Sequence, residues 1–208
     1  MEPKNGLIWA EYGTVLTKLA DYKEGRDAYL KALEFKPNSP RVHLSLGHVY
    51  KTMGEINNSI NSYKNTIIQN NLSGEAYWSL ANLKTYSFSE NEIKDMEETL
   101  KCDMSDIERS QMHFALGKAY EVKKDFDKSF KNYYEGNKVK KGLINYSSDD
   151  TAENTKKILE FFNQENIQNL SKSSTKDQDP IFVLGMPRSG STLVCLLYTS
   201  DAADEFMG

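Results

Sequence analysis

The chain has 208 residues, of which 38% are hydrophobic and 11% aromatic, and its formal net charge is −4. This composition supplies enough apolar side chains for a folded core and excludes a disordered chain. The negative charge argues against nucleic acid as a partner, and no apolar run approaches the roughly 20 residues that span a bilayer.

The N-terminus and the two cysteines indicate the compartment. Residues 1–6 lack the apolar core of a secretion signal, so we expect a cytoplasmic protein. Cys102 and Cys195 are far apart and have neither CxxC nor Cys/His spacing, which predicts neither a disulfide framework nor a zinc site.

The first 143 residues repeat. Gly13, Gly47 and Ala81 stand 34 residues apart, and Gly117 follows Ala81 after 36. A 34-residue period with Trp, Leu-Gly, Tyr, Ala and Pro landmarks is the signature of tetratricopeptide (TPR) repeats, each of which is a pair of antiparallel helices. The sequence therefore predicts a mostly α fold, a solenoid of helical hairpins.

Four repeats are expected, at residues 6–39, 40–73, 74–109 and 110–143. The third repeat is degenerate, because Lys84 stands at a large apolar position and the stretch 87–91 interrupts the pattern. In all four repeats the regularly spaced Tyr, Leu and Phe residues are expected to form the core between neighbouring helices.

A protein or peptide partner is expected in the groove that first helices of such repeats form. The candidate residues face away from the expected packing: Glu11, Arg41, His48, Lys51, Trp78, Asn82, Tyr86 and Lys118. The alternative is a merely solvated face. His43, His48 and His113 do not form a cluster in the sequence, so no metal site is predicted.

Two segments follow the repeats. The apolar spacing in residues 144–170 predicts one connecting amphipathic helix. Residues 171–179 are polar and charged and predict an exposed linker, at which a second domain would begin.

Residues 180–194 combine an apolar, β-prone run with a glycine turn. After Pro180, Ile181–Leu184 predict a buried strand, and the spacing Gly185-x-x-x-x-Gly190-Ser191-Thr192 is that of a phosphate-binding P-loop. Ser191 stands where the P-loop has Lys, and Arg188 is the available cation. A strand, a glycine turn and a helix N-terminus together favour phosphate binding.

The element PRSGSTL, preceded by IFVLG, resembles the 5′-phosphosulfate loop of sulfotransferases, closest to the tyrosylprotein sulfotransferase type. The resemblance implies that 3′-phosphoadenosine 5′-phosphosulfate (PAPS) is the sulfate donor. It also implies which residues hold the donor, namely Arg188, Ser189, Gly190, Ser191 and Thr192, and that Arg188 is catalytic. TPR repeats followed by such a loop are also similar to a bacterial class of fused proteins.

The end of the chain is too short to complete a sulfotransferase domain, since only sixteen residues follow Thr192. Within residues 195–208, the stretch CLLYTSDAADE resembles the translation of a sequencing-library adapter, so we interpret this segment as an artefact. The expected fold is therefore a TPR solenoid followed by the first strand and P-loop of a truncated α/β domain.

These patterns lead to one main hypothesis and two alternatives. The main hypothesis is an inactive N-terminal fragment of a TPR-containing sulfotransferase, which transfers sulfate from PAPS to a hydroxyl acceptor such as protein tyrosine. One alternative is a TPR scaffold that binds other proteins. The other is a P-loop, kinase-like phosphotransferase, which the missing Lys disfavours.

Overall fold

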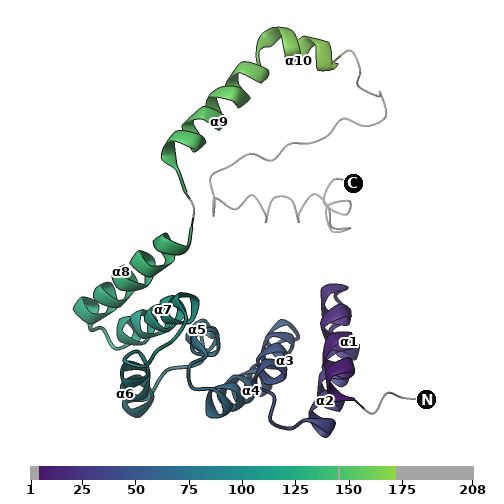
Figure 1. Cartoon of the computed structure of the whole chain (residues 1–208), viewed down its shortest axis with the longest axis vertical. Helices are drawn as coiled ribbons and strands as arrows, with labels where there is room; N and C mark the ends of the chain where they lie inside the picture. The colour runs from purple at the N-terminus through teal and green to yellow at the C-terminus, as the bar shows by residue number, and fades with distance from the viewer. Residues whose placement is uncertain (1–4, 145, 172–208) are drawn as a thin grey trace, which may run out of the picture. The chain divides into compact units, whose positions relative to one another are not determined.

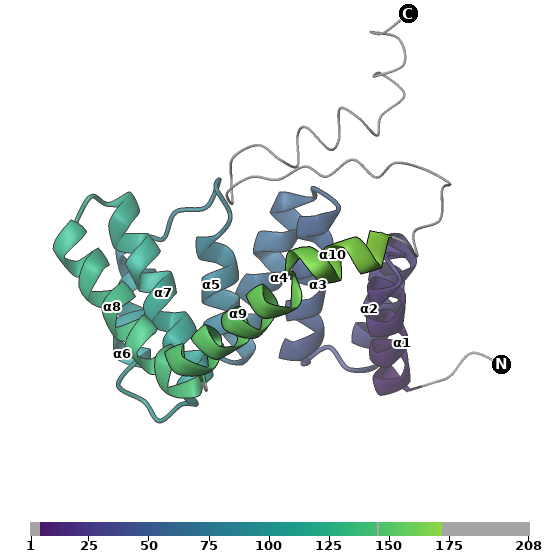
Figure 2. The ribbon, with the colours of Figure 1, turned by 90° about the horizontal axis from the view of Figure 1, so that it is seen from above.

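The computed structural model of the protein describes residues 5–144 and 146–171, and every regular element within these ranges is a helix. The chain divides into two compact units, Met1–Tyr146 and Ser147–Gly208. In the described part, the first unit contains helices α1 to α8 and the second contains α9 and α10. Figures 1 and 2 show the helices of the first unit following one another as stacked hairpins.

The first four helices form two hairpins and are α1 (Gly6–Lys18), α2 (Tyr22–Phe35), α3 (Pro40–Thr52) and α4 (Ile56–Gln69). The α1 helix packs on α2, α3 packs on α4, and α2 contacts the following α3. Asn5 starts α1 by accepting the N–H of Leu7 at 2.9 Å, and Pro40 starts α3 at a position where its missing N–H is not needed. The turn between α3 and α4 contains Gly54 with φ of 78°, a conformation that glycine adopts without strain.

The next four helices are arranged less regularly and are α5 (Gly74–Ala81), α6 (Glu90–Thr99), α7 (Asp106–Val122) and α8 (Phe126–Leu143). The short α5 packs chiefly on α7, and α7 packs along α8. The segment between α5 and α6 places Leu83 and Phe88 in the core. The two helices of the third pair, α5 and α6, therefore contact each other less than the helices of the other pairs do.

The recurring small residues mark the places where paired helices come closest. A Cβ built on Gly13, Gly47 or Gly117 would lie 2.9, 2.3 or 2.8 Å from a ring atom of Tyr29, Tyr63 or Tyr133, respectively. Each tyrosine thus packs flat against the backbone of the partner helix, where only a residue without a side chain fits. These glycines serve helix packing, as their spacing predicts.

The second unit contains α9 (Ser148–Phe161) and α10 (Gln164–Ser171), whereas the sequence predicted a single helix in residues 144–170. The break has a local cause. Asn163 accepts the N–H of Asn166 at 2.8 Å, which starts a new helix immediately after α9 ends.

The described residues support only the helical part of the predicted fold. All the regular elements in residues 5–144 and 146–171 are helices, and no strand is seen there. The predicted strand and loop, residues 180–194, lie outside the described residues. So do the predicted donor-binding residues Arg188, Ser189, Gly190, Ser191 and Thr192, the linker from residue 172 onward, and the segment 195–208.

Candidate peptide-binding site

The first helices of successive hairpins carry one equivalent face, which on α7 also contacts the partner helix α8 through Phe114. We call it the A-helix face and define it by the residues that stand three positions before the recurring small residues: Ala10, Leu44, Trp78 and Phe114. All four are partly exposed or reach the edge of the core. The two aromatic members lie next to each other, on α5 and α7.

An apolar pocket opens beside these two aromatic residues. The rings of Trp78 and Phe114 are 5.6 Å apart, and Phe114 also approaches the ring of Tyr133 at 6.5 Å. Lys140 Nζ lies 5.7 Å from the centre of the Phe114 ring, within reach of a cation–π interaction. We call this the Trp78 pocket; it measures about 280 Å³ and is lined by Trp78, Ile107, Ser110, Gln111, Phe114, Lys140, Leu143 and Ile144.

His48 connects α3 to α5 on the same face. Its Nε2 lies 3.3 Å from Oε1 of Glu75, and its Nδ1 lies 2.9 Å from the hydroxyl of Tyr63. A carboxylate only accepts hydrogen bonds, so the proton belongs on Nε2, and a neutral His48 then accepts from Tyr63. The hydrogen bond from His48 holds the pKa of Glu75 below its ordinary value, against the opposing effect of burial.

Tyr86 is a predicted groove residue that the structure ties to α6. Its hydroxyl donates to Glu92, which also lies 3.5 Å from Lys64 Nζ. Burial, followed by this contact with Glu92, raises the pKa of Tyr86. Tyr86 therefore links elements of the fold and has no free hydroxyl to offer a ligand.

The other predicted residues are placed on or near the outer surface of the first helices. Asn82 donates to the carbonyl of Trp78 at 2.9 Å, and Lys118 forms an ion pair with Glu121 at 2.8 Å. Glu11, Arg41 and Lys51 are exposed.

The structure brings together only some of the eight predicted residues. Asn82 follows Trp78 by one turn at the C-terminal end of α5, and Lys118 is one turn from Phe114 on α7, so these three side chains border one patch. His48 reaches this patch through Glu75, which is one turn before Trp78. Glu11 lies on α1 and has no contact with the patch.

Of the eight residues that line the Trp78 pocket, the sequence analysis predicted only Trp78, and two of the missed residues show why. Phe114 carries a clear signal, since it precedes Gly117 by three residues just as Trp78 precedes Ala81. Lys140 carries none, because it comes from a second helix and reaches the pocket only through the packing of α8 on α7.

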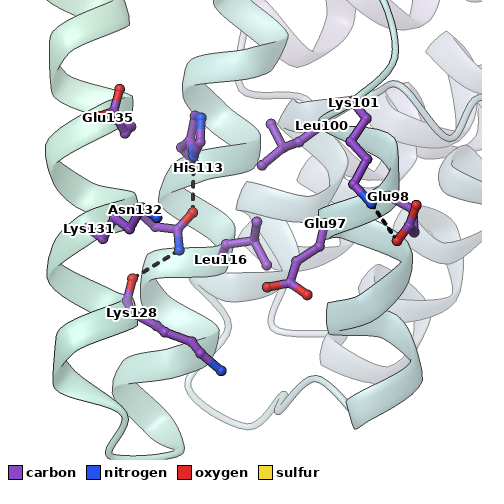
Figure 3. A pocket seen from close by; sticks show the side chains of 10 residues that line it. All are labelled: Glu97, Glu98, Leu100, Lys101, His113, Leu116, Lys128, Lys131, Asn132 and Glu135. Carbon is purple, nitrogen blue, oxygen red and sulfur yellow. Dashed lines mark hydrogen bonds and ion pairs between the residues drawn. The ribbon is translucent and has the colours of Figure 1, made fainter.

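A second pocket, about 390 Å³, lies between α6, α7 and α8 (Figure 3). Its lining mixes acidic and basic side chains around Leu100 and Leu116. His113 Nδ1 lies 3.0 Å from Asn132 Oδ1, and Lys101 pairs with Glu98 at 2.7 Å. Most of its charged groups have partners within the fold, since Glu98 pairs with Lys101, Lys128 with Asp125 and Glu135 with Lys138, so the Trp78 pocket is the better candidate for an apolar ligand.

Within the described residues, no three His, Cys, Asp or Glu side chains are grouped so that they could hold a metal ion. None of the described helices has the length and apolar character needed to cross a bilayer.

Comparison with known proteins identifies part of the repeat region. The family model of the TPR repeat matches residues 13–54. An uncharacterized protein of Aquifex aeolicus (strain VF5) is 30% identical over 171 residues, which is 82% of this chain. This chain spans only 22% of the length of that relative.

Solved structures with a similar fold include two of MamA and one of BtubC (BKLC) from P. vanneervenii. One MamA structure has a TM-score of 0.54 and 17% identity, covering 70% of this chain and 84% of MamA. The other has a TM-score of 0.51 and 21% identity, covering 85% and 97%. BtubC has a TM-score of 0.52 and 13% identity, covering 68% and 65%. At these identities the similarity establishes the fold alone.

These findings correct the sulfotransferase resemblance. The matches point to a TPR protein, and the described residues contain no strand or P-loop domain that would support a sulfotransferase. PAPS as donor was implied by that resemblance alone, and the kinase-like alternative rested on the same loop. Residues 13–54 are thus a TPR repeat, and the described fold is an all-helical solenoid of the TPR type.

Proposed function

We propose that this chain is a protein-interaction scaffold that binds a segment of a partner polypeptide on its A-helix face. A TPR repeat supports protein partners in general. The observation that favours this face is the Trp78 pocket, in which two aromatic rings 5.6 Å apart are left partly exposed beside a lysine. Aromatic residues in such pockets are typical binding hot spots.

The chemistry of the pocket suggests the kind of peptide. The pocket is lined mainly by aromatic and aliphatic side chains. Two lysines lie beside them: Lys140 lines the pocket, and Lys118 lies on the adjoining turn of α7. A large apolar side chain would fill the pocket, and a neighbouring acidic residue would pair with Lys140. Arg41 and Lys51, exposed on α3, extend the positive charge along the face.

Selection of peptides from a random displayed library on the immobilised chain tests this proposal. The selected sequences should combine a large apolar residue with an acidic one. Trp78→Ala should weaken their binding about tenfold or more, which corresponds to about 1.4 kcal/mol. Lys140→Glu should weaken the acidic peptides in particular.

Two controls make the result decisive. Trp78→Phe keeps an aromatic ring and should retain most of the affinity, which separates lost contact from lost folding. Ile68→Ala changes a side chain on α4 that is 80% exposed and should bind as wild type. Peptides that bind Trp78→Ala and wild type equally would reject the A-helix face as the site.

A further inference from the structure

The outer side of α1 carries a stripe of apolar side chains that the described fold leaves uncovered. Ile8, Tyr12 and Val15 are 51%, 51% and 53% exposed and stand at helical spacing on one side of the helix. We call this stripe the α1 face. Apolar side chains aligned on one helix face favour packing against another element.

The same repeat positions are buried in every later hairpin. Moving along the chain by the repeat spacing leads from Ile8, Tyr12 and Val15 to equivalents that are all at most 6% exposed: Val42, Leu46 and Val49; Ala76, Leu80 and Leu83; Met112, Leu116 and Ala119. In each case the second helix of the preceding hairpin contacts the helix that bears them: α2 contacts α3, α4 contacts α5 and α6 contacts α7. The α1 face thus stands where the later first helices each receive the preceding hairpin.

The α8 helix presents the other half of this interface. In α4, Ile56 and Ile60 are partly buried against the core of the following helices. Their repeat equivalents in α8 are Phe126 and Phe130, which are 66% and 71% exposed. The ring of Phe130 stacks with that of Tyr134 at 6.4 Å, and we call these three aromatic residues the α8 face.

We propose that the α8 face of one copy of this chain packs on the α1 face of a second copy, so that hairpins stack between copies as they do within one chain. The two faces are the two sides of one repeating interface, in which the second helix of one hairpin contacts the first helix of the next. Pairing two α1 faces would leave both α8 faces uncovered. A head-to-tail contact leaves a free face at each end and therefore adds further copies, until a ring closes or as an open chain.

The test uses one charged substitution at each face of the full chain, Tyr12→Glu and Phe130→Glu, with mass measured by light scattering over a range of concentrations. Wild type should grow beyond a dimer as its concentration rises. Each variant alone should stay monomeric. An equimolar mixture should form a dimer of twice the monomer mass, because the intact α8 face of one variant meets the intact α1 face of the other.

Other outcomes overturn the proposal. A monomeric wild type would show that neither face recruits a second copy, as would a mixture that stays monomeric. A dimer of Phe130→Glu alone would point to pairing of two α1 faces.

Ile68→Glu is the control, because it places the same charge on an exposed side chain away from both faces and should associate as wild type. Circular dichroism checks folding, and Tyr12→Ser with Phe130→Ser repeats the test if a charged variant unfolds. The result does not depend on peptide binding at the A-helix face.

Discussion

At the scale of single residues, the fold depends on tyrosines that pack against glycine backbone. The contact recurs in three hairpins, between Gly13 and Tyr29, Gly47 and Tyr63, and Gly117 and Tyr133. In two of the hairpins a serine adds the same hydrogen bond across the pair, from Ser59 to the carbonyl of Gly47 and from Ser129 to that of Gly117, both at 2.8 Å.

Gly47→Ala is expected to destabilise the protein. The new Cβ would lie 2.3 Å from the ring of Tyr63, a buried side chain that cannot move aside freely. Overpacking of this kind costs about 1–3 kcal/mol, and the better helix propensity of Ala offsets only about 1 kcal/mol of it. Urea denaturation should therefore show a lower free energy of unfolding. Gly142→Ala is the matched control, since its Cβ would meet no atom within 4 Å, and it should be neutral or slightly stabilising.

His48→Ala is expected to raise the pKa of the Glu75 carboxyl towards its ordinary value of 4.5, because the hydrogen bond from His48 is the main cause that lowers it. A carboxyl whose pKa is lowered by folding stabilises the protein above its unfolded-state pKa. That contribution disappears as the pH falls through the folded-state pKa. The variant should consequently lose stability at neutral pH and show a smaller further loss in acid.

NMR titration of the Glu75 side-chain carboxyl measures this shift directly. His43→Ala serves as the control, because His43 contacts the carbonyl of Pro37 instead and should leave the titration of Glu75 unchanged. An unchanged Glu75 pKa in His48→Ala would show that another group sets it.

Sequence spacing predicts these residue contacts unevenly. The glycines could be identified because a fixed period places each one opposite a tyrosine sixteen residues later in the same hairpin. The partner of His48 could not, since Glu75 lies in the next hairpin and their approach depends on how α3 and α5 stack. Lys140 could not be predicted at the Trp78 pocket either, because its position there depends on how α8 packs on α7.

At the scale of elements, α6 is the most weakly packed helix of the first unit. It contacts α7 only lightly and inserts Ile93 and Met96 into the core. Its start is fixed by a capping box, in which Ser89 accepts the N–H of Glu92 at 3.3 Å and Glu92 accepts the N–H of Ser89 at 2.8 Å. Lys84 and the stretch 87–91 indicate an irregular unit in the sequence, but they do not reveal that α5 would pack chiefly on α7.

Ser89→Ala is expected to loosen α6 selectively. Loss of a serine cap costs about 1 kcal/mol, and α6 has little packing to compensate. Hydrogen exchange should become roughly five times faster in residues 90–99. Ser105→Ala removes the equivalent cap of α7, at which Glu108 N–H donates at 3.3 Å, and should leave exchange in α6 unchanged. Equal acceleration of exchange across α3, α4 and α6 would contradict a local role for the cap.

At the scale of the whole molecule, the described core of the first unit consists of two clusters. One lies between α2 and α3 and includes Tyr29, Leu46 and Val49. The larger one extends from Tyr63 on α4 to Tyr120 on α7. The repeat period predicts that stability comes from neighbouring hairpins. It does not predict that the core divides between α3 and α4, because the division arises from how the irregular third pair draws α4, α5 and α7 together.

Because the core is divided, we expect the same Leu→Ala substitution to destabilise a different set of helices in each cluster. Leu46 and Leu116 are 2% and 1% exposed, and replacing either by Ala should cost about 2–5 kcal/mol. Leu46→Ala should accelerate hydrogen exchange mainly in α1 to α4, because α3 packs on α2 and α4 and helices of this type transmit stability chiefly to their neighbours. Leu116→Ala should affect α4 to α8 together, since its cluster joins all the helices from α4 to α7 and α8 packs along α7. Exchange measured by mass spectrometry on peptides from each helix separates the two patterns. If both variants lost protection equally over α1 to α8, the unit would unfold as one cooperative body and the two clusters would not be independent.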